Sequence, residues 1–226
     1  MSLRDPAATL FATAGILATV GASFVGLVYL PDAQLDPVGA VTLPGSGERY
    51  PAPLTGRAAR GRQVYIGLGC IYCHSQQVRQ EDFGGDISRG WGARASVPLD
   101  YRDEKPPLLG TMRTGPDLRN VGVRLPSEDW HYLHLYNPRI VSEHSIMPSY
   151  RFLFEEHAES ESFGRPLNAI DVPAPYGPKD AWVAPKPDAV ALVAYLKSLR
   201  HDVALPPGAS TPEGPSSPTP TPEAPR

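Results

Sequence analysis

The chain has 226 residues and a formal net charge of −3. This balance provides no basic face or stripe of the kind that binds nucleic acid, so we expect no nucleic-acid partner. Its two cysteines are too few for a disulfide framework in a chain of this length.

The first predicted element is a membrane-spanning helix over residues 7–30, which carry no charged side chain and lie between Pro6 and Pro31. About 20 apolar residues are needed to cross a bilayer core of about 30 Å. A cleaved signal peptide is the alternative, but its apolar region is usually only about 7–15 residues long. Because no small-residue cleavage site follows Leu30, we predict a retained anchor helix.

The charges on either side of this helix predict its orientation. Arg4 and the terminal amine precede the helix, whereas residues 34–48 contain no Lys or Arg. Positive charge near a membrane helix favours the cytoplasmic side. We therefore expect residues 1–6 to form a short cytoplasmic N-terminus and the rest of the chain to lie outside the cytoplasm.

A stripe of small residues runs along the helix at every fourth position: Ala14, Ala18, Ala22 and Gly26. Such a stripe lets the backbone of a second membrane helix approach closely. Ala and Gly are also simply common in membrane helices, so the stripe predicts a membrane partner without requiring one.

The remaining chain divides by composition into a linker, a domain and a tail. Residues 31–54 are rich in Pro and Gly and read as an extended linker, and the Pro-rich residues 205–226 are predicted to be disordered. The domain between them, residues 55–204, should begin with a helix over residues 55–69 and end with one over residues 187–200. Gly61 is a point where the first helix could make a close contact.

The motif C-x-x-C-H occupies residues 70–74 and is typical of c-type haem attachment. Cys70 and Cys73 would bind one haem covalently, and His74 would coordinate its iron. A thioredoxin-like redox pair would need a βαβ setting that this Gly- and Pro-rich chain lacks. A zinc site usually draws on a second Cys or His pair. A large buried haem would also explain how the irregular middle of the domain obtains a core.

The second iron ligand should be Met or His. Residues 114–118, T-G-P-D-L, resemble the loop that class I cytochromes c place beside the ligating His. This resemblance implies that the Pro116 carbonyl accepts a hydrogen bond from His74, which puts Met112 on the wrong side of the haem. We therefore predict Met147 as the second ligand. The competing ligands are three histidines: His131, His134 and His144.

Several further blocks resemble subunit II of cbb3-type cytochrome c oxidases, a membrane-anchored mono-haem subunit. They are G-R-Q-V-Y at residues 61–65, S-Q-Q-V-R at 75–79, R-G-W-G at 89–92, R-T-G-P-D-L at 113–118, D-W-H at 129–131, N-P-R at 137–139 and M-P-S-Y at 147–150. The resemblance is close over residues 55–150. Two departures are Gln77, where the family commonly has Met, and residues 155–185, which align poorly.

The resemblance implies a mainly α fold: a class I cytochrome c-like haem domain with long loops, plus one N-terminal transmembrane helix. One haem c would receive electrons from a dihaem subunit or a soluble cytochrome c. It would pass them to the catalytic haem-copper subunit, which reduces dioxygen, so this chain would be no enzyme by itself. Its expected location is a bacterial inner membrane, with the haem domain in the periplasm.

The resemblance also implies roles for other residues. Arg113 could hydrogen-bond a haem propionate, or it could be an ordinary surface arginine. Ser75, Gln76 and Arg79 are expected at the exposed end of the attachment helix, where they would contact the catalytic subunit. The alternative is that they simply cap the haem motif. Trp91 and Trp130 are expected to be packing aromatics.

Two other functions share the plan of an anchor and one haem. The first is a free-standing, membrane-tethered cytochrome c shuttle. The second is the cytochrome c subunit of a nitric oxide reductase, which the S-Q-x-x-R and R-T-G-P-D-L blocks make less suitable.

Overall fold

The computed structural model describes residues 5–34, 39–159 and 164–209. The N-terminal helix belongs to one compact unit, and residues 40–211 form the other. The predicted cytoplasmic N-terminus falls largely outside the described residues, as does the Pro-rich tail from residue 210 on.

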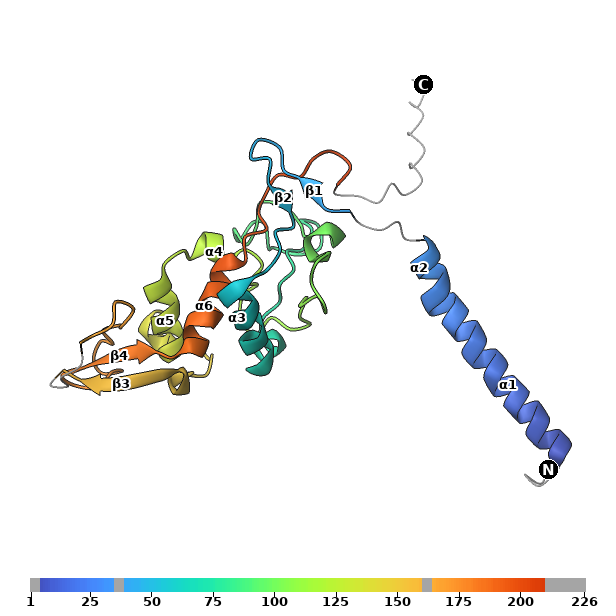
Figure 1. Cartoon of the computed structure of the whole chain (residues 1–226), viewed down its shortest axis with the longest axis horizontal. Coiled ribbons are helices and arrows are strands. Elements are labelled where there is room, and N and C mark those ends of the chain that lie inside the picture. Colours follow the sequence, from blue (N-terminus) through green and yellow to red (C-terminus); the bar gives the residue numbers. More distant parts are fainter. Residues whose placement is uncertain (1–4, 35–38, 160–163, 210–226) are drawn as a thin grey trace, which may run out of the picture. The chain divides into compact units, whose positions relative to one another are not determined.

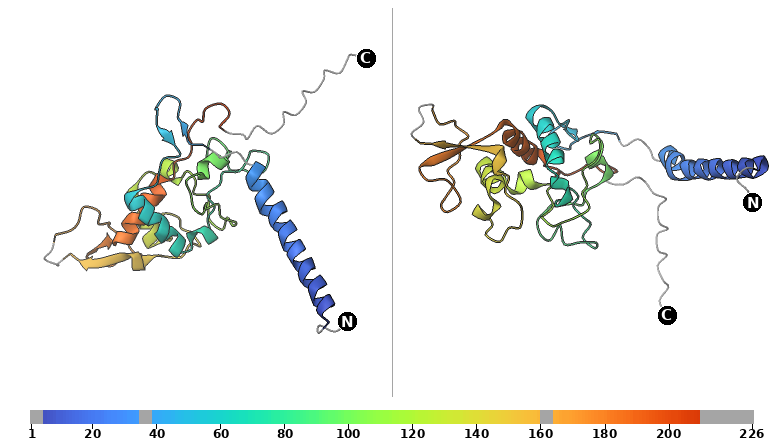
Figure 2. Two further views of the ribbon diagram at one scale, coloured as in Figure 1. Left: turned by 45° about the vertical axis from the view of Figure 1, so that its right-hand side comes forward. Right: turned by 90° about the horizontal axis from the view of Figure 1, so that it is seen from below.

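Residues 6–34 form one continuous helix, which Figures 1 and 2 show as a single rod in blue. It comprises α1 (Pro6–Phe24), a π-helical turn η1 (Val25–Tyr29) and α2 (Leu30–Gln34). Asp5 caps its start by accepting a hydrogen bond from the Ala7 amide. By length and composition, residues 6–33 could cross a membrane, with a mean hydropathy of 1.9.

The predicted end of this helix at Pro31 is wrong, because the helix continues through that proline to Gln34. Pro31 has no amide hydrogen with which to continue the ordinary hydrogen-bond pattern. The π-helical turn ends two residues before it, and the Leu30 amide donates to the Val25 carbonyl, five residues back. Such a local widening lets a helix accommodate a proline without ending.

Part of the predicted linker is folded. Strands β1 (Val41–Thr42) and β2 (Arg49–Tyr50) pair antiparallel, with Val41 opposite Tyr50. Tyr50 is buried, and its hydroxyl donates to Asp100 at 2.7 Å. The packed domain therefore begins near residue 40 rather than at residue 55, because Tyr50 is anchored by a partner 50 residues further along the chain.

Two helices at opposite ends of the domain lie side by side in Figure 1: α3 (Gly56–Gly67) and α6 (Pro187–Ser198). They confirm the two helices predicted from the sequence. At their crossing, a Cβ on Gly61 would lie 1.8 Å from the Ala191 carbonyl oxygen, so only glycine allows this contact. Tyr65 and Tyr195 meet edge to face beside it, with ring centroids 5.4 Å apart.

The helix α5 (Glu128–Tyr136) also packs against α6, and the single turn α4 (Val121–Arg124) precedes it. Ser127 caps α5 by accepting a hydrogen bond from the Trp130 amide. Together with α3 and α6, α5 supplies most of the buried apolar core, which includes Tyr65, Tyr132, Leu135, Tyr136, Leu192, Val193 and Tyr195.

Long loops connect these helices, as the sequence predicted. Between Cys73 and Asn120 the chain forms only one short 3-10 helix, Pro98–Tyr101. Residues 155–185, which align poorly, contain most of a hairpin of β3 (Phe154–Ala158) and β4 (Ala181–Pro185). Figures 1 and 2 show this hairpin extending beyond the helices of the domain.

Candidate haem site

The attachment motif forms a single tight turn directly after α3. Gly69 ends the helix with a left-handed backbone (φ 72°), and the 3-10 helix Cys70–Tyr72 follows. The amides of Cys73 and His74 both donate to the Cys70 carbonyl, at 3.2 and 3.0 Å. The turn therefore gathers the two cysteines and His74 within one stretch of helical backbone. Both thiols are free, Cys70 half-buried and Cys73 exposed.

One ring nitrogen of His74 is hydrogen-bonded, and no hydrogen bond joins the other to any residue that the structure describes. Its Nδ1 lies 2.7 Å from the Pro116 carbonyl oxygen, which is the contact that the sequence predicted. Burial lowers the pKa of His74 even though Pro116 and Asp117 act to raise it, so the imidazole stays neutral near pH 7. A neutral imidazole that donates from Nδ1 has its Nε2 lone pair available to a metal.

Because Gly115 has no side chain, its loop can lie directly against the His74 ring. A Cβ at this position would lie 2.3 Å from His74 Cε1 and 2.8 Å from each ring nitrogen. Two backbone hydrogen bonds tie the same loop to the motif, Gly115 to the Cys73 carbonyl at 2.9 Å and Leu118 to the Ser75 carbonyl at 2.8 Å. The loop 115–118 thus holds the imidazole in one orientation.

Asp117 is fully buried and joins its own loop to residues 75–77, which directly follow His74. Its carboxylate accepts hydrogen bonds from the Ser75 hydroxyl at 2.6 Å, the Gln77 amide at 2.7 Å and the Arg119 amide at 2.8 Å. A buried carboxylate with several donors is well compensated for the loss of water.

The burial of Ser75 and Gln76 makes one prediction wrong. We expected both side chains to be available to a partner, but they are 4% and 0% exposed. Ser75 bonds to Asp117, and Gln76 accepts from the Tyr195 hydroxyl at 3.1 Å. Arg79 is only half-buried, so its predicted role stays a prediction.

Arg113 makes several contacts within the protein. Its Nε donates to the Ser75 hydroxyl at 2.8 Å, one Nη pairs with Asp86, and the other donates to the Gln77 carbonyl at 2.6 Å. Its guanidinium also lies 5.4 Å from the ring centroid of Trp91. These contacts fix the side chain behind the motif. The predicted hydrogen bond to a haem propionate stays a prediction.

Met147 is half-buried and packs against the apolar core together with Cys70 and Tyr150. The Tyr150 amide donates to the Leu135 carbonyl at 2.8 Å, which ties the M-P-S-Y loop to the end of α5. The Tyr150 side chain also interacts with the Cys70 thiol. The loop that carries Met147 thus borders the attachment turn, whereas Met112 is 58% exposed.

The structure separates the three competing histidines, which the sequence could not. His144 is exposed, and His131 is buried with Nε2 2.9 Å from the Leu125 carbonyl. The His134 ring stacks on Trp130 at 4.7 Å, and its buried Nδ1 has no hydrogen-bond partner within the described part of the chain.

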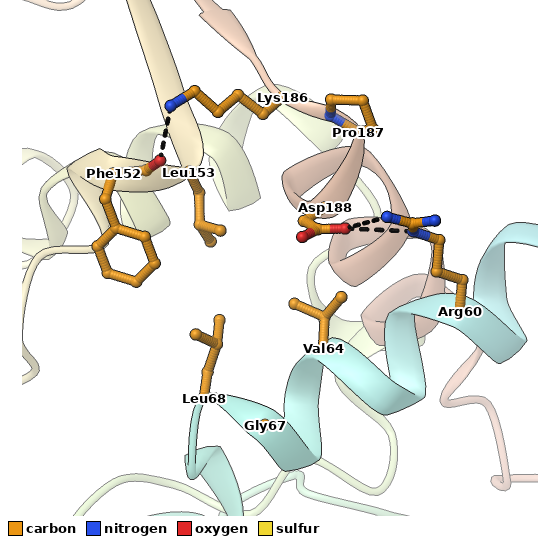
Figure 3. Close-up of a pocket in the computed structure, with 9 residues that line it drawn as sticks. All are labelled: Arg60, Val64, Gly67, Leu68, Phe152, Leu153, Lys186, Pro187 and Asp188. Carbon is orange, nitrogen blue, oxygen red and sulfur yellow. Dashed lines mark hydrogen bonds and ion pairs between the residues drawn. The ribbon is translucent and has the colours of Figure 1, made fainter.

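A hollow of about 470 Å³ lies between α3, residues 152–153 and the start of α6 (Figure 3). Val64, Leu68 and Leu153 give it an apolar wall, and an ion pair between Arg60 and Asp188 (2.7 Å) lies at its side. None of the nine residues that line it is a predicted haem residue.

The residues around the motif fit a c-type haem. Two thiols share one turn, a neutral imidazole is fixed through Nδ1, and only a glycine leaves room for its ring.

Comparison with known proteins agrees with this geometry. Residues 46–184, more than half of the chain, match the family described as cytochrome c oxidase, mono-heme subunit/FixO. The match confirms the resemblance to subunit II of the cbb3-type oxidases, and it extends through the β3–β4 hairpin that the sequence motifs did not cover. A search of curated proteins found no match.

Proposed function

Because the chain belongs to the mono-haem subunit (FixO) family of cytochrome c oxidases, we propose that it carries electrons through one covalent haem c to the catalytic subunit of a cbb3-type oxidase. The donor would be a dihaem subunit or a soluble cytochrome c. Dioxygen would be reduced in the haem-copper partner, and this chain would catalyse no reaction by itself.

The haem would supply an iron that accepts and releases one electron. In this proposal Cys70 and Cys73 bind the haem covalently, and His74 and Met147 coordinate the iron. The Pro116 carbonyl orients His74, and Arg113 interacts with a propionate. A class I cytochrome c-like domain is supported by the close crossing of α3 and α6 at Gly61.

One observation carries the proposal: Gly115 and Pro116 hold the His74 imidazole next to two free thiols, and its Nε2 bonds to none of the described residues. A thiol redox pair would have no need of this fixed imidazole. The free-standing shuttle would use the same haem, so the two functions differ in the partner rather than in the site.

The partner surface is proposed to lie around the attachment turn. Tyr72 lies in the attachment turn and is 75% exposed. Ile146 directly precedes Met147 and is 74% exposed. Exposed apolar side chains at such positions suit contact with another protein. The N-terminal helix would anchor the chain in the inner membrane with the haem domain in the periplasm.

The test is to solubilise membranes gently, purify the full chain and measure its haem content and its companions. We expect one covalent haem per chain and co-purification of a multi-spanning haem protein. A stable lone chain carrying haem would contradict the oxidase role, and a chain without covalent haem would contradict the cytochrome role.

A matched pair of variants separates an oxidase subunit from a shuttle. Ala18→Leu with Ala22→Leu fills the small-residue stripe and should release the chain from the oxidase while haem content stays constant. Leu17→Ile, which leaves the stripe intact, should leave the complex assembled. If the stripe variant stays bound to the oxidase, the stripe is not the contact.

A further inference from the structure

His134 lies on α5, the helix that is tied to the loop carrying Met147. The tie is the hydrogen bond from the Tyr150 amide to the Leu135 carbonyl, one residue beyond His134. Trp130, one helical turn earlier on α5, stacks on the imidazole with ring planes 11° apart. The ring is therefore held in place by packing against Trp130.

The hydrogen bonding of His134 is incomplete. Its Nδ1 is buried, and no polar group in the described residues bonds to it. A buried polar atom without a partner is costly, and a bound water, ion or ligand can supply the missing bond. His134 therefore has a coordinating nitrogen that the protein itself does not use.

The electrostatic surroundings of His134 include two other histidines. Burial is the main effect that lowers the pKa of His134, and the charges of His131 and His74 lower it further. Together these effects bring the pKa to about 4. The geometry of the two other candidate histidines differs from that of His134. His144, by contrast, is exposed, and Nε2 of His131 already faces the Leu125 carbonyl.

We propose that His134 is a reserve ligand of the haem site: the imidazole nitrogen that the protein leaves unused coordinates the iron when the Met147 thioether is removed. The proposal rests on the proposed function, because it needs a haem bound at Cys70 and Cys73. In the native protein His134 would keep this side of the site closed around Met147.

The experiment compares the full-length haem-loaded chain with Met147→Ala and with Met147→Ala/His134→Phe. Phenylalanine keeps an aromatic ring against Trp130 but has no nitrogen to offer. Electron paramagnetic resonance and absorption spectra of the oxidised proteins report whether the iron has a second strong ligand. We expect Met147→Ala to remain low-spin with two imidazole ligands and the double variant to become high-spin.

A third variant, Met147→Ala/His144→Phe, is the matched control, because His144 is exposed, and it should remain low-spin. Added imidazole should return the His134 double variant to the low-spin state, which shows that the site is folded. A high-spin Met147→Ala protein, or a low-spin His134 double variant without added imidazole, would overturn the proposal. A wild-type chain without covalent haem would instead overturn the proposed function.

Discussion

The two candidate iron ligands are supported very differently by the protein around them. His74 is held by the Pro116 carbonyl, by the close approach of Gly115 and by the buried Asp117 network behind it. Met147 lies on a short loop, fixed mainly by apolar packing and by the bond from Tyr150 to Leu135.

This difference indicates a division of roles between the two sides. An imidazole that coordinates a metal must keep one orientation, and charge-assisted and backbone hydrogen bonds around it restrict its movement. A flexible thioether needs less directional support because it adapts to its surroundings. We therefore expect changes on the His74 side to damage the fold and changes on the Met147 side to alter mainly the spectrum and the potential.

The largest effect is expected from Asp117→Ala. The change removes the acceptor of the buried Ser75 hydroxyl and Arg119 amide and of the partly buried Gln77 amide. Loss of such a buried acceptor should lower the free energy of unfolding by about 3–5 kcal/mol, which urea denaturation would measure. Asp82→Ala, at an exposed position, should change it by less than about 0.5 kcal/mol. Equal losses in both variants would refute the special role of Asp117.

A smaller loss is expected from Gly115→Ala. The added methyl group would collide with the His74 ring, which can move only by giving up its bond to Pro116. Overpacking of this kind costs about 1–3 kcal/mol and should also reduce the fraction of chains that carry haem. Gly67→Ala is the control, because its Cβ would meet nothing within 4 Å. Normal haem content in Gly115→Ala would show that the contact is not tight.

Local patterns in the sequence predicted the parts of this arrangement that depend on neighbours in the chain. The C-x-x-C-H turn, the helices that bracket the domain and the loop at Pro116 are of this kind. The burial of Ser75 and Gln76 depends on Asp117 and Tyr195, which are distant in the chain, so polar side chains were mistaken for exposed ones.

The same reason explains two other differences. Tyr50 is buried and bonds to Asp100, which lies 50 residues away in the chain. The Pro- and Gly-rich residues around Tyr50 give no sign of this contact, so the predicted linker was too long. Among the three histidines, only contacts in space distinguish His134 from His131 and His144.

Acid should weaken the His74 side through Asp86. Burial acts to raise the pKa of Asp86, but hydrogen bonds from Arg113 and from the Arg79 amide outweigh it and hold this pKa below its ordinary value of about 3.9. A carboxyl with a depressed folded-state pKa stabilises the protein above its unfolded pKa, and this contribution is lost as the pH falls through the folded value.

The parent chain should therefore lose stability below about pH 4, and Asp86→Asn should lose less over the same range. Denaturation midpoints measured from pH 6 to pH 2.5 provide the comparison. An identical acid dependence in the two proteins would mean that Arg113 does not stabilise the charged form of Asp86.

The smallest effect on stability is expected from Met147→Leu, which preserves size and apolar character and should cost less than about 1.5 kcal/mol in packing. The optical signature should nevertheless change, because leucine cannot coordinate iron: the Met-to-iron charge-transfer absorption should vanish and the potential should fall. Met112→Leu, at an exposed side chain, should alter neither. If Met112→Leu removed the absorption instead, the assignment of Met147 as the second ligand would be wrong. The second ligand would then come from the segment next to the loop that holds His74.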